Sequence, residues 1–209
     1  MEKILFFVLS IVYFAFSLTN EEIKKYYWQS YNFEKMQNYE DAIKALMPIY
    51  DKYPNGYTVN LRLGWLYYIK GNYRNSIYHY KKAMKIFPYS LEAKLGYTLP
   101  LLAQRKYKDA VDMCYQILKI DFYNYYGNLR LSFALRELKD YTNAHKVVSK
   151  MLALYPTDTN FLVELGIIYY KTNDLSKAKK IFNDVLILDP INIKAKRYLE
   201  KISKKEEMD

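Results

Sequence analysis

The 209-residue sequence is poor in the residue types from which catalytic and metal sites are usually built. Cys114 is its single cysteine, which excludes an internal disulfide and a cysteine-rich metal site. His79 and His145 are its only histidines, and they stand 66 positions apart. The sequence also lacks a glycine-rich phosphate loop, a His-Glu-x-x-His pattern and a serine-centred elbow. We therefore predict a protein that is not an enzyme and that holds no cofactor or metal.

Glycine and proline are scarce as well, with six of each, which disfavours a loop-rich all-β architecture. Hydrophobic residues make up 51% of the chain, which excludes a disordered protein. Lysine and arginine outnumber aspartate and glutamate by 32 to 22. This excess could serve nucleic acid, an anionic membrane surface or an acidic partner, but no run of five basic residues occurs. We interpret the lysines as scattered along solvated helix faces.

The N-terminus has the pattern of an export signal. Residues 4–16 form an apolar run, too short to cross a bilayer comfortably but suited to the core of a signal peptide. Ala15 and Ser17 stand three and one positions before a cleavage site, and the run offers only Ser10 toward the polar face of an amphipathic helix. We predict that residues 1–17 are a signal peptide, with an uncleaved signal anchor as the alternative. The protein is then periplasmic or secreted, or anchored by this segment, and a lone cysteine suits an oxidising compartment.

The rest of the sequence repeats with a period of 34 residues. The clearest series is proline, which recurs at this spacing or at twice this spacing, with Phe122 at the missing position: Pro54, Pro88, Pro156 and Pro190. A second series keeps the same period with small residues: Ala42, Ser76, Ala110, Ala144 and Ala178. A third is mostly tyrosine: Tyr39, Tyr73, Tyr107, Tyr141 and Leu175. Three series with one period indicate a repeat protein.

One unit, residues 57–90, explains the pattern. Apolar residues recur at helical spacing in two segments, which the turn signal Gly71 and Asn72 separates. The first segment has Leu61, Leu63, Gly64, Tyr67 and Tyr68, and the second has Ser76, Ile77, Tyr80, Ala83, Met84 and Ile86. Pro88 ends the second helix, because proline lacks the amide that would continue it. One such hairpin cannot bury its apolar side alone, so neighbouring hairpins must stack.

The chain therefore resembles the tetratricopeptide repeat proteins, whose pattern is a large residue, Leu-Gly and Tyr in the first helix, then Ala, Phe, Ala and Pro in the second. The fifth copy matches it best, with Leu162, Leu165, Gly166, Tyr169, Ala178, Phe182, Val185 and Pro190. The third copy departs most, with Thr98, Cys114 and Phe122 where Gly, Phe and Pro are usual. The resemblance implies an all-α, right-handed α-solenoid of five helix-turn-helix repeats over residues 23–190, at about 23–56, 57–90, 91–124, 125–158 and 159–192. Residues 191–209 are expected to form a capping helix over 192–201 and a charged tail over 204–209.

The repeat phase assigns the remaining unusual residues. His79 and His145 fall in the second helices of different repeats, about two repeats apart, so we predict surface positions and no shared metal. Cys114 occupies an apolar position of the phase and is predicted to lie in the core. Pro48 and Pro100 fall inside predicted helices, and each should kink or interrupt its helix. At Pro100 we predict a bend in the groove.

The resemblance places the binding surface on the inner wall, which first-helix residues line. Here these positions are apolar and aromatic, and we expect about half of them to pack against neighbouring helices. They are Tyr27, Tyr31, Leu61, Trp65, Tyr68, Leu95, Leu99, Leu102, Tyr126, Leu129, Phe133, Val163, Ile167 and Tyr170. Arg62, Arg130 and Arg136 are expected at its rim. Some relatives bind a terminal carboxylate with Lys and Asn, but Tyr27 and Tyr31 stand there instead, so that mode is predicted to be absent.

These features predict a non-catalytic scaffold or adaptor of the cell envelope that holds an extended or helical peptide of a partner protein in this groove. Two alternatives stay open. The first is a structural component that self-associates through the groove. The second is binding of polyanions or anionic membranes by the basic surface, although export disfavours nucleic acid as a partner. Membrane contact would involve only the N-terminal segment or this basic surface.

Overall fold

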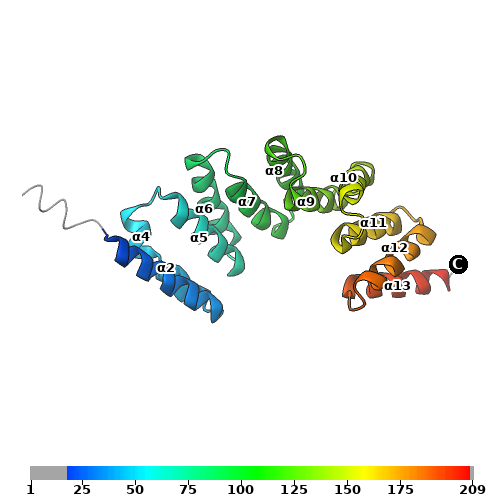
Figure 1. Ribbon diagram of the computed structural model, residues 1–209, viewed down its shortest axis with the longest axis horizontal. Helices are drawn as coiled ribbons and strands as arrows, with labels where there is room; N and C mark the ends of the chain where they lie inside the picture. Colours follow the sequence, from blue (N-terminus) through cyan, green and yellow to red (C-terminus); the bar gives the residue numbers. More distant parts are fainter. Residues whose placement is uncertain (1–17, 208–209) are drawn as a thin grey trace, which may run out of the picture. The chain divides into compact units, whose positions relative to one another are not determined.

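The computed structural model describes residues 18–207, and these residues form helices joined by turns and short irregular segments, with no strand. The predicted signal peptide, residues 1–17, lies outside the described residues. The helices of the described part are α2 (Asn20–Lys35), α3 (Tyr39–Lys44), α4 (Met47–Lys52), α5 (Tyr57–Ile69), α6 (Tyr73–Ile86), α7 (Leu91–Ala103), α8 (Tyr107–Ile120), α9 (Tyr125–Glu137), α10 (Tyr141–Leu154), α11 (Thr159–Lys171), α12 (Leu175–Leu188) and α13 (Ile193–Glu206). Figure 1 shows them in sequence order.

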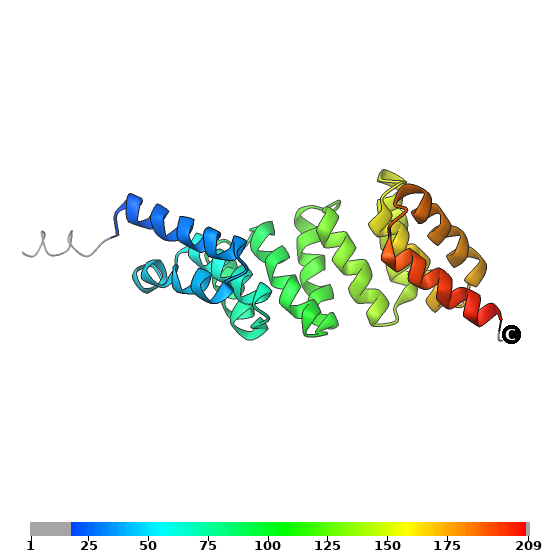
Figure 2. The same cartoon turned by 90° about the horizontal axis from the view of Figure 1, so that it is seen from below.

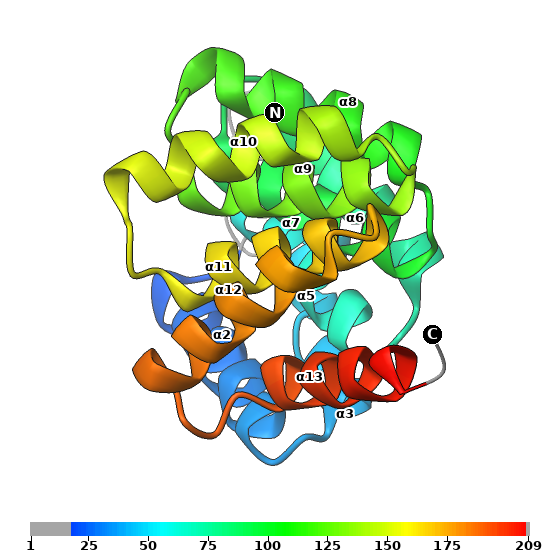
Figure 3. The ribbon, with the colours of Figure 1, turned by 90° about the vertical axis from the view of Figure 1, so that its right-hand side faces the viewer.

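The chain divides into two compact units, of which the structure describes residues 18–100 and 101–207. Within the C-terminal unit α9 packs against both α8 and α10, and α11 packs against α10 and α12 (Figure 3). The last two helices, α12 and α13, also lie side by side (Figure 2). Successive helices thus form pairs packed as in a tetratricopeptide solenoid, which confirms the predicted fold class.

The turn within each pair has the same backbone conformation in every copy. A residue with positive φ recurs every 34 positions, at Gln37, Gly71, Arg105, Lys139 and Asn173, with φ between 58° and 82°. In four of the five turns the next residue is Asn or Asp, and its side chain accepts a hydrogen bond from the backbone N–H three residues on. This side chain caps the second helix, because the first amides of a helix have no partner inside it. The turn signals that the sequence predicted are therefore confirmed.

The two helices of a pair meet at small residues. The hydroxyl of Ser76 donates to the carbonyl oxygen of Gly64 at 2.7 Å. A Cβ atom on Gly64 would lie 2.9 Å from the ring of Tyr80, and one on Gly166 would lie 2.7 Å from the ring of Phe182. Each large second-helix ring thus needs a first helix without a side chain at that point. Buried aliphatic residues complete the core of each unit, for example Leu46 and Leu63 in the first and Val163 and Val185 in the second.

The two unusual prolines have different effects. Pro48 interrupts its second helix as predicted, since α3 ends at Lys44 and α4 begins at Met47, with Pro48 in its first turn. Pro100 causes no interruption, because α7 is one continuous helix up to Ala103. The proline lies in the last turn of α7, where the loss of one amide leaves little helix to disrupt. The predicted bend there stays a prediction.

The last helix is longer than expected. The predicted capping helix covered residues 192–201, whereas α13 continues to Glu206 and takes in the first residues of the predicted charged tail. Asn192 caps its start by accepting from the N–H of Ala195 at 3.0 Å. Near its end Glu206 pairs with Lys179 at 2.8 Å. Such contacts with α12 extend the helix into a segment that composition alone suggested to be a tail.

At the positive-φ position of the turn, replacing glycine by a larger residue should lower the free energy of unfolding, and replacing a larger residue by glycine should raise it. Gly71→Ala should lower the free energy of unfolding by about 1 kcal/mol, since its φ is 82° and the added Cβ would meet no atom within 4 Å. Arg105→Gly should raise that free energy by about 0.5 kcal/mol, because it relieves the same strain at φ 58°. Urea unfolding at constant pH measures both. Equal changes of the same sign would show that the turn conformation does not control stability.

Candidate functional site

The N-terminal unit has a hollow of about 400 Å³ on the side of its first helices. We call it the N-terminal hollow. Its wall consists of side chains from α2, α5 and α7, with Tyr80 from α6: Tyr27, Tyr31, Tyr57, Thr58, Leu61, Arg62, Trp65, Tyr80, Glu92, Gly96 and Leu99. A Cβ on Gly96 would lie only 2.2 Å from the Tyr80 ring, so glycine is required there for this ring to reach the hollow.

A charged network lies beneath the aromatic wall of this hollow. Arg62 is only 8% exposed and forms an ion pair with Glu34. Its guanidinium carbon lies 3.8 Å from the centre of the Tyr31 ring. The indole N–H of Trp65 donates to the same Glu34 carboxylate at 2.6 Å. Glu34 therefore fixes both the cation below the wall and the tryptophan within it, and burial raises the pKa of the neighbouring Tyr27.

Arg62 and Arg136 were expected at the rim of the groove, but both side chains are buried, and Arg62 lies within the wall of the N-terminal hollow. Arg136 is also 8% exposed, and its guanidinium donates to both oxygens of Glu164, at 2.7 and 3.3 Å. A buried arginine needs a carboxylate partner because an unpaired buried charge is costly. Glu34 shares its position in the repeat with Tyr68 and Leu102, and Glu164 shares its position with Gly96 and Arg130, so the repeat pattern does not reveal that either glutamate pairs with an arginine. Arg130 is half-buried and lies 5.5 Å from the centre of the Tyr126 ring.

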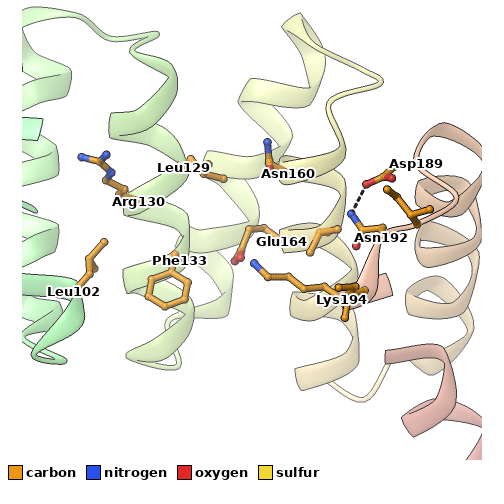
Figure 4. Close-up of a pocket in the computed structure, with 12 residues that line it drawn as sticks. Leu102, Leu129, Arg130, Phe133, Asn160, Glu164, Asp189, Asn192 and Lys194 are labelled. Carbon is orange, nitrogen blue, oxygen red and sulfur yellow. Dashed lines mark hydrogen bonds between the residues drawn. The ribbon is translucent and has the colours of Figure 1, made fainter. Parts of the chain in front are cut away.

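The C-terminal unit has a second hollow, of about 520 Å³, which we call the C-terminal hollow. Figure 4 shows its lining, which comes from α9, α11, the end of α7, the loop between α12 and α13, and the start of α13. The lining residues are Leu102, Leu129, Arg130, Phe133, Asn160, Val163, Glu164, Asp189, Ile191, Asn192, Ile193 and Lys194. The side-chain amide of Asn192 donates to Asp189 at 2.9 Å and steadies the loop before α13. This hollow carries more charge than the N-terminal hollow.

Nine of the fourteen predicted wall residues line one of the two hollows. The N-terminal hollow contains Tyr27, Tyr31, Leu61, Trp65 and Leu99, and the C-terminal hollow contains Leu102, Leu129, Phe133 and Val163. The other five line neither. Ile167 is buried in the core, and Leu95 is half-buried. Tyr68 lies 5.8 Å from the Trp65 ring, and Tyr170 lies 5.1 Å from the Tyr198 ring. Tyr126 is 56% exposed.

The repeat phase missed several lining residues. Tyr57 stands one helical turn before Leu61, on the same face of α5, so an extension of the phase by four residues would have found it. Ile193 follows Thr159, the first residue of α11, by 34 positions. The last helix therefore continues the series of first helices and contributes to the wall, instead of only covering the end of the array.

The prediction that His79 is a surface residue is also wrong. His79 is 6% exposed, stacked on the Tyr67 ring at 5.3 Å, and met edge-on by Tyr50 and Tyr78. Its Nδ1 lies 3.0 Å from Oδ1 of Asn60. The amide nitrogen of Asn60 already donates to two backbone carbonyls, so Oδ1 is the acceptor and Nδ1 of His79 carries the proton. Burial, with Lys82 nearby, lowers the pKa of His79 from 6.5 to about 4, so the ring is neutral near pH 7.

Cys114 and His145 are the other two residues of reactive type that the sequence singled out. Cys114 is fully buried, as predicted, and burial raises its pKa to about 12, so the thiolate is not formed near neutral pH. His145 is half-buried, with Nε2 3.3 Å from the Tyr169 hydroxyl. Within residues 18–207 no three His, Cys, Asp or Glu side chains are grouped to hold a metal ion. Among the helices of this same part none is long and apolar enough to span a membrane.

Two family models, both described as tetratricopeptide repeat, match residues 29–90 and 135–202. Together with the helix-pair fold, these matches identify the chain as a tetratricopeptide repeat protein. Comparison with curated protein sequences gives no match.

Solved structures with a similar fold include MamA from Desulfovibrio magneticus, which is 18% identical with a TM-score of 0.75 over 85% of this chain and 99% of that one. A tetratricopeptide repeat protein from Parabacteroides merdae is 13% identical, with a TM-score of 0.79 over 88% of this chain and 73% of its own. A thermophilic protein of this class from Thermus thermophilus is 12% identical, with a TM-score of 0.66 over 86% and 97%. At these identities the similarity concerns the fold alone.

Removing the charge of Glu34 should destabilise the N-terminal unit. Glu34→Gln leaves the buried guanidinium of Arg62 without its counter-ion and should lower the free energy of unfolding by about 2 kcal/mol. Glu21→Gln is the matched control, because Glu21 pairs with Lys24 on the exposed surface of the same helix and should cost less than about 0.5 kcal/mol. Chemical unfolding followed by circular dichroism compares the two. Equal decreases in the free energy of unfolding would show that the buried Arg62–Glu34 pair stabilises the protein no more than an exposed pair does.

Stability should fall on acidification because of His79. The unfolded chain binds a proton at His79 near pH 6.5, whereas the folded protein does so only near pH 4. Between these values the unfolded state binds more protons, so the free energy of unfolding decreases as pH is lowered and levels off below about 4. The loss should approach about 3 kcal/mol. His79→Gln removes this titration and should flatten the profile from pH 7 to pH 4; parallel profiles of the two proteins would contradict this role.

Proposed function

We propose that this protein is an exported, non-catalytic scaffold that holds a peptide or helix of a partner protein against its first helices. The N-terminal hollow carries the proposal. It combines four tyrosines, a tryptophan and two leucines with a volume of about 400 Å³, which lies in the range of ligand sites. Trp65 remains 37% exposed on this wall, although a large apolar side chain gains most from burial.

The structure of the hollow is suited to binding without rearrangement. The hydrogen bond to Glu34 orients the Trp65 ring, and Arg62 supports the Tyr31 ring from beneath. Rigid aromatic anchors lose little conformational entropy when a partner binds, which is why tryptophan, tyrosine and arginine dominate binding energy at interfaces.

The C-terminal hollow supports a second, more polar contact with the partner. Leu102, Leu129 and Phe133 provide apolar area, and Asn160 and Lys194 provide donors. The terminal-carboxylate mode of some relatives is not part of the proposal, since Tyr27 and Tyr31 occupy its positions. Export to the envelope rests on the composition of residues 1–17 and is likewise proposed.

Partner capture should depend on the N-terminal hollow. We expect Leu99→Glu to reduce crosslinked recovery of the partner from envelope fractions at least tenfold, because it places a charge on an apolar wall. Trp65→Ala should weaken capture similarly through the loss of the anchor. Trp28→Ala is the control, since Trp28 is 66% exposed on α2 and does not line the hollow. Circular dichroism must show unchanged helicity in all three variants.

The outcomes separate the competing functions. A discrete protein lost with Leu99→Glu and Trp65→Ala but kept with Trp28→Ala supports the scaffold. Equal recovery with all variants would contradict it. Recovery of a second copy of this chain alone would indicate self-association, for which Ile187, Ile191 and Ile193 expose more than 70% of their surface near the end of the C-terminal unit.

A further inference from the structure

The face formed by the second helices has different side chains in the two units. Each residue of this face in the N-terminal unit corresponds to the residue 68 positions, or two repeats, later in the C-terminal unit. In the N-terminal unit aromatic rings fill this face. His79 is enclosed by Tyr50, Tyr67 and Tyr78, and the hydroxyls of Tyr50 and Tyr78 lie 3.4 Å apart. Lys82 lies over both outer rings, 5.0 Å from the centre of Tyr50 and 5.3 Å from that of Tyr78.

The corresponding residues of the C-terminal unit do not fill the face. Leu118 replaces Tyr50, Lys146 replaces Tyr78, and Val147 replaces His79. A hollow of about 590 Å³ results, lined by Tyr115, Leu118, Lys119, Phe122, Leu131, Lys146, Val147 and Lys150. We call it the lysine-rimmed hollow. Asn128, the counterpart of Asn60, retains its two bonds to backbone carbonyls, but its buried Oδ1 has no hydrogen-bond partner within the described part of the chain.

All the charges that line this hollow have one sign. Lys119, Lys146 and Lys150 form no ion pair with any residue of 18–207, and no acidic residue is part of the lining. Lys150 is partly buried, and this burial lowers the pKa of its ammonium group because a charge is less stable where water is excluded. A carboxylate placed at this rim would stabilise that charge.

We propose that the lysine-rimmed hollow binds an acidic peptide segment of a partner protein, with one aromatic side chain in the hollow and carboxylates on the lysines. This site is separate from the two first-helix hollows and does not depend on the function proposed for them. It would give the protein a second docking surface, on its second helices.

Three observations favour this occupant. The space that the partner's ring would enter is the space that tyrosine rings fill in the other unit. Lys150 donates to the carbonyl oxygen of Phe122 at 3.2 Å and lies 3.9 Å from the centre of that ring, so it is already held over an aromatic face as Lys82 is. A further ring would complete the arrangement around it. Finally, Tyr115 and Lys119 stand one turn apart on α8, and Lys146 and Lys150 stand one turn apart on α10, while Phe122 lies in the turn after α8. A short peptide segment that crosses the hollow would therefore meet lysines of both helices.

A variant that fills the hollow with the residues of the other unit tests the proposal. The double variant Lys146→Tyr/Val147→His transfers the pair Tyr78 and His79, and its imidazole can donate to the unpartnered Oδ1 of Asn128. It should therefore keep the thermal stability of the parent while closing the hollow. The probe is a fluorescein-labelled peptide with one central tryptophan flanked by glutamates, and its anisotropy is measured with the full chain.

Binding of the probe should weaken at least tenfold in the filled variant. It should weaken about fivefold to tenfold in Lys119→Gln/Lys146→Gln, through the loss of two charges. The control Lys180→Gln/Lys196→Gln removes two exposed lysines outside the hollow and should change affinity less than twofold. Replacing the tryptophan of the probe by alanine should weaken binding to the parent by about tenfold.

Three results would overturn the proposal. One is equal affinity of the parent and the filled variant, and another is equal affinity for the probes with tryptophan and alanine. The third is binding of phosphatidylglycerol vesicles, lost with Lys119→Gln/Lys146→Gln, by a chain that does not bind the peptide, which would assign the lysines to a membrane surface. Because the glutamine variant alters only exposed or rim side chains, it decides the question even if the filled variant fails to fold.

Discussion

The close approach of the two helices in each pair is the constraint on which the rest of the structure depends. Gly64 and Gly166 let the rings of Tyr80 and Phe182 pack directly on a helix backbone. The residue with positive φ in each turn, repeated every 34 residues, reverses the chain so that the second helix lies against the first. With the pair fixed, its remaining apolar side can be buried only by the next pair, because a hairpin of two helices has no other core. Stability, and with it the position of every wall residue, follows from this local geometry.

A second period, of two repeats, is superimposed on the first. Tyr57 and Tyr125 begin α5 and α9, and each hydroxyl bonds to a residue at the start of the next first helix, Ser90 at 2.7 Å and Asp158 at 2.9 Å. Lys82 and Lys150 each donate to a backbone carbonyl just after the preceding second helix. The second and fourth repeats are thus distinguished by a shared set of polar bonds to their neighbours. The 34-residue pattern conceals this division, because it describes only the positions that all copies share.

The sequence predicted the helix pairs, their turns and the burial of Cys114, since these depend on short-range spacing that recurs in several copies. It also predicted nine residues of the two first-helix hollows, because helix phase decides which side chains share a face. It did not predict the burial of His79, Arg62 and Arg136. The side chains that these residues contact lie 19, 32 and 28 positions away in the sequence, respectively. Polar residues carry no periodic signal of their own, so a buried polar pair is visible only when both members are placed in space.

One face of each helix packs against other helices and the other face is open, and side chains can differ between repeats more freely on the open face. Side chains at the close contacts between helices cannot change without a clash. A carbon added at Gly64 would lie 2.9 Å from the Tyr80 ring of the same pair, and one added at Gly96 would lie 2.2 Å from the Tyr80 ring of the preceding pair. Positions on the open faces are free of this constraint, and there the copies differ most: rings fill the second-helix face of one unit, while lysines surround a hollow in the other. A residue that leaves a neighbouring group unsatisfied, as Val147 does for Asn128, stabilises the folded chain less than the alternative present at His79. Retention of such a residue on an open face is expected where the space it leaves is used by a partner, whose own side chains then complete the packing.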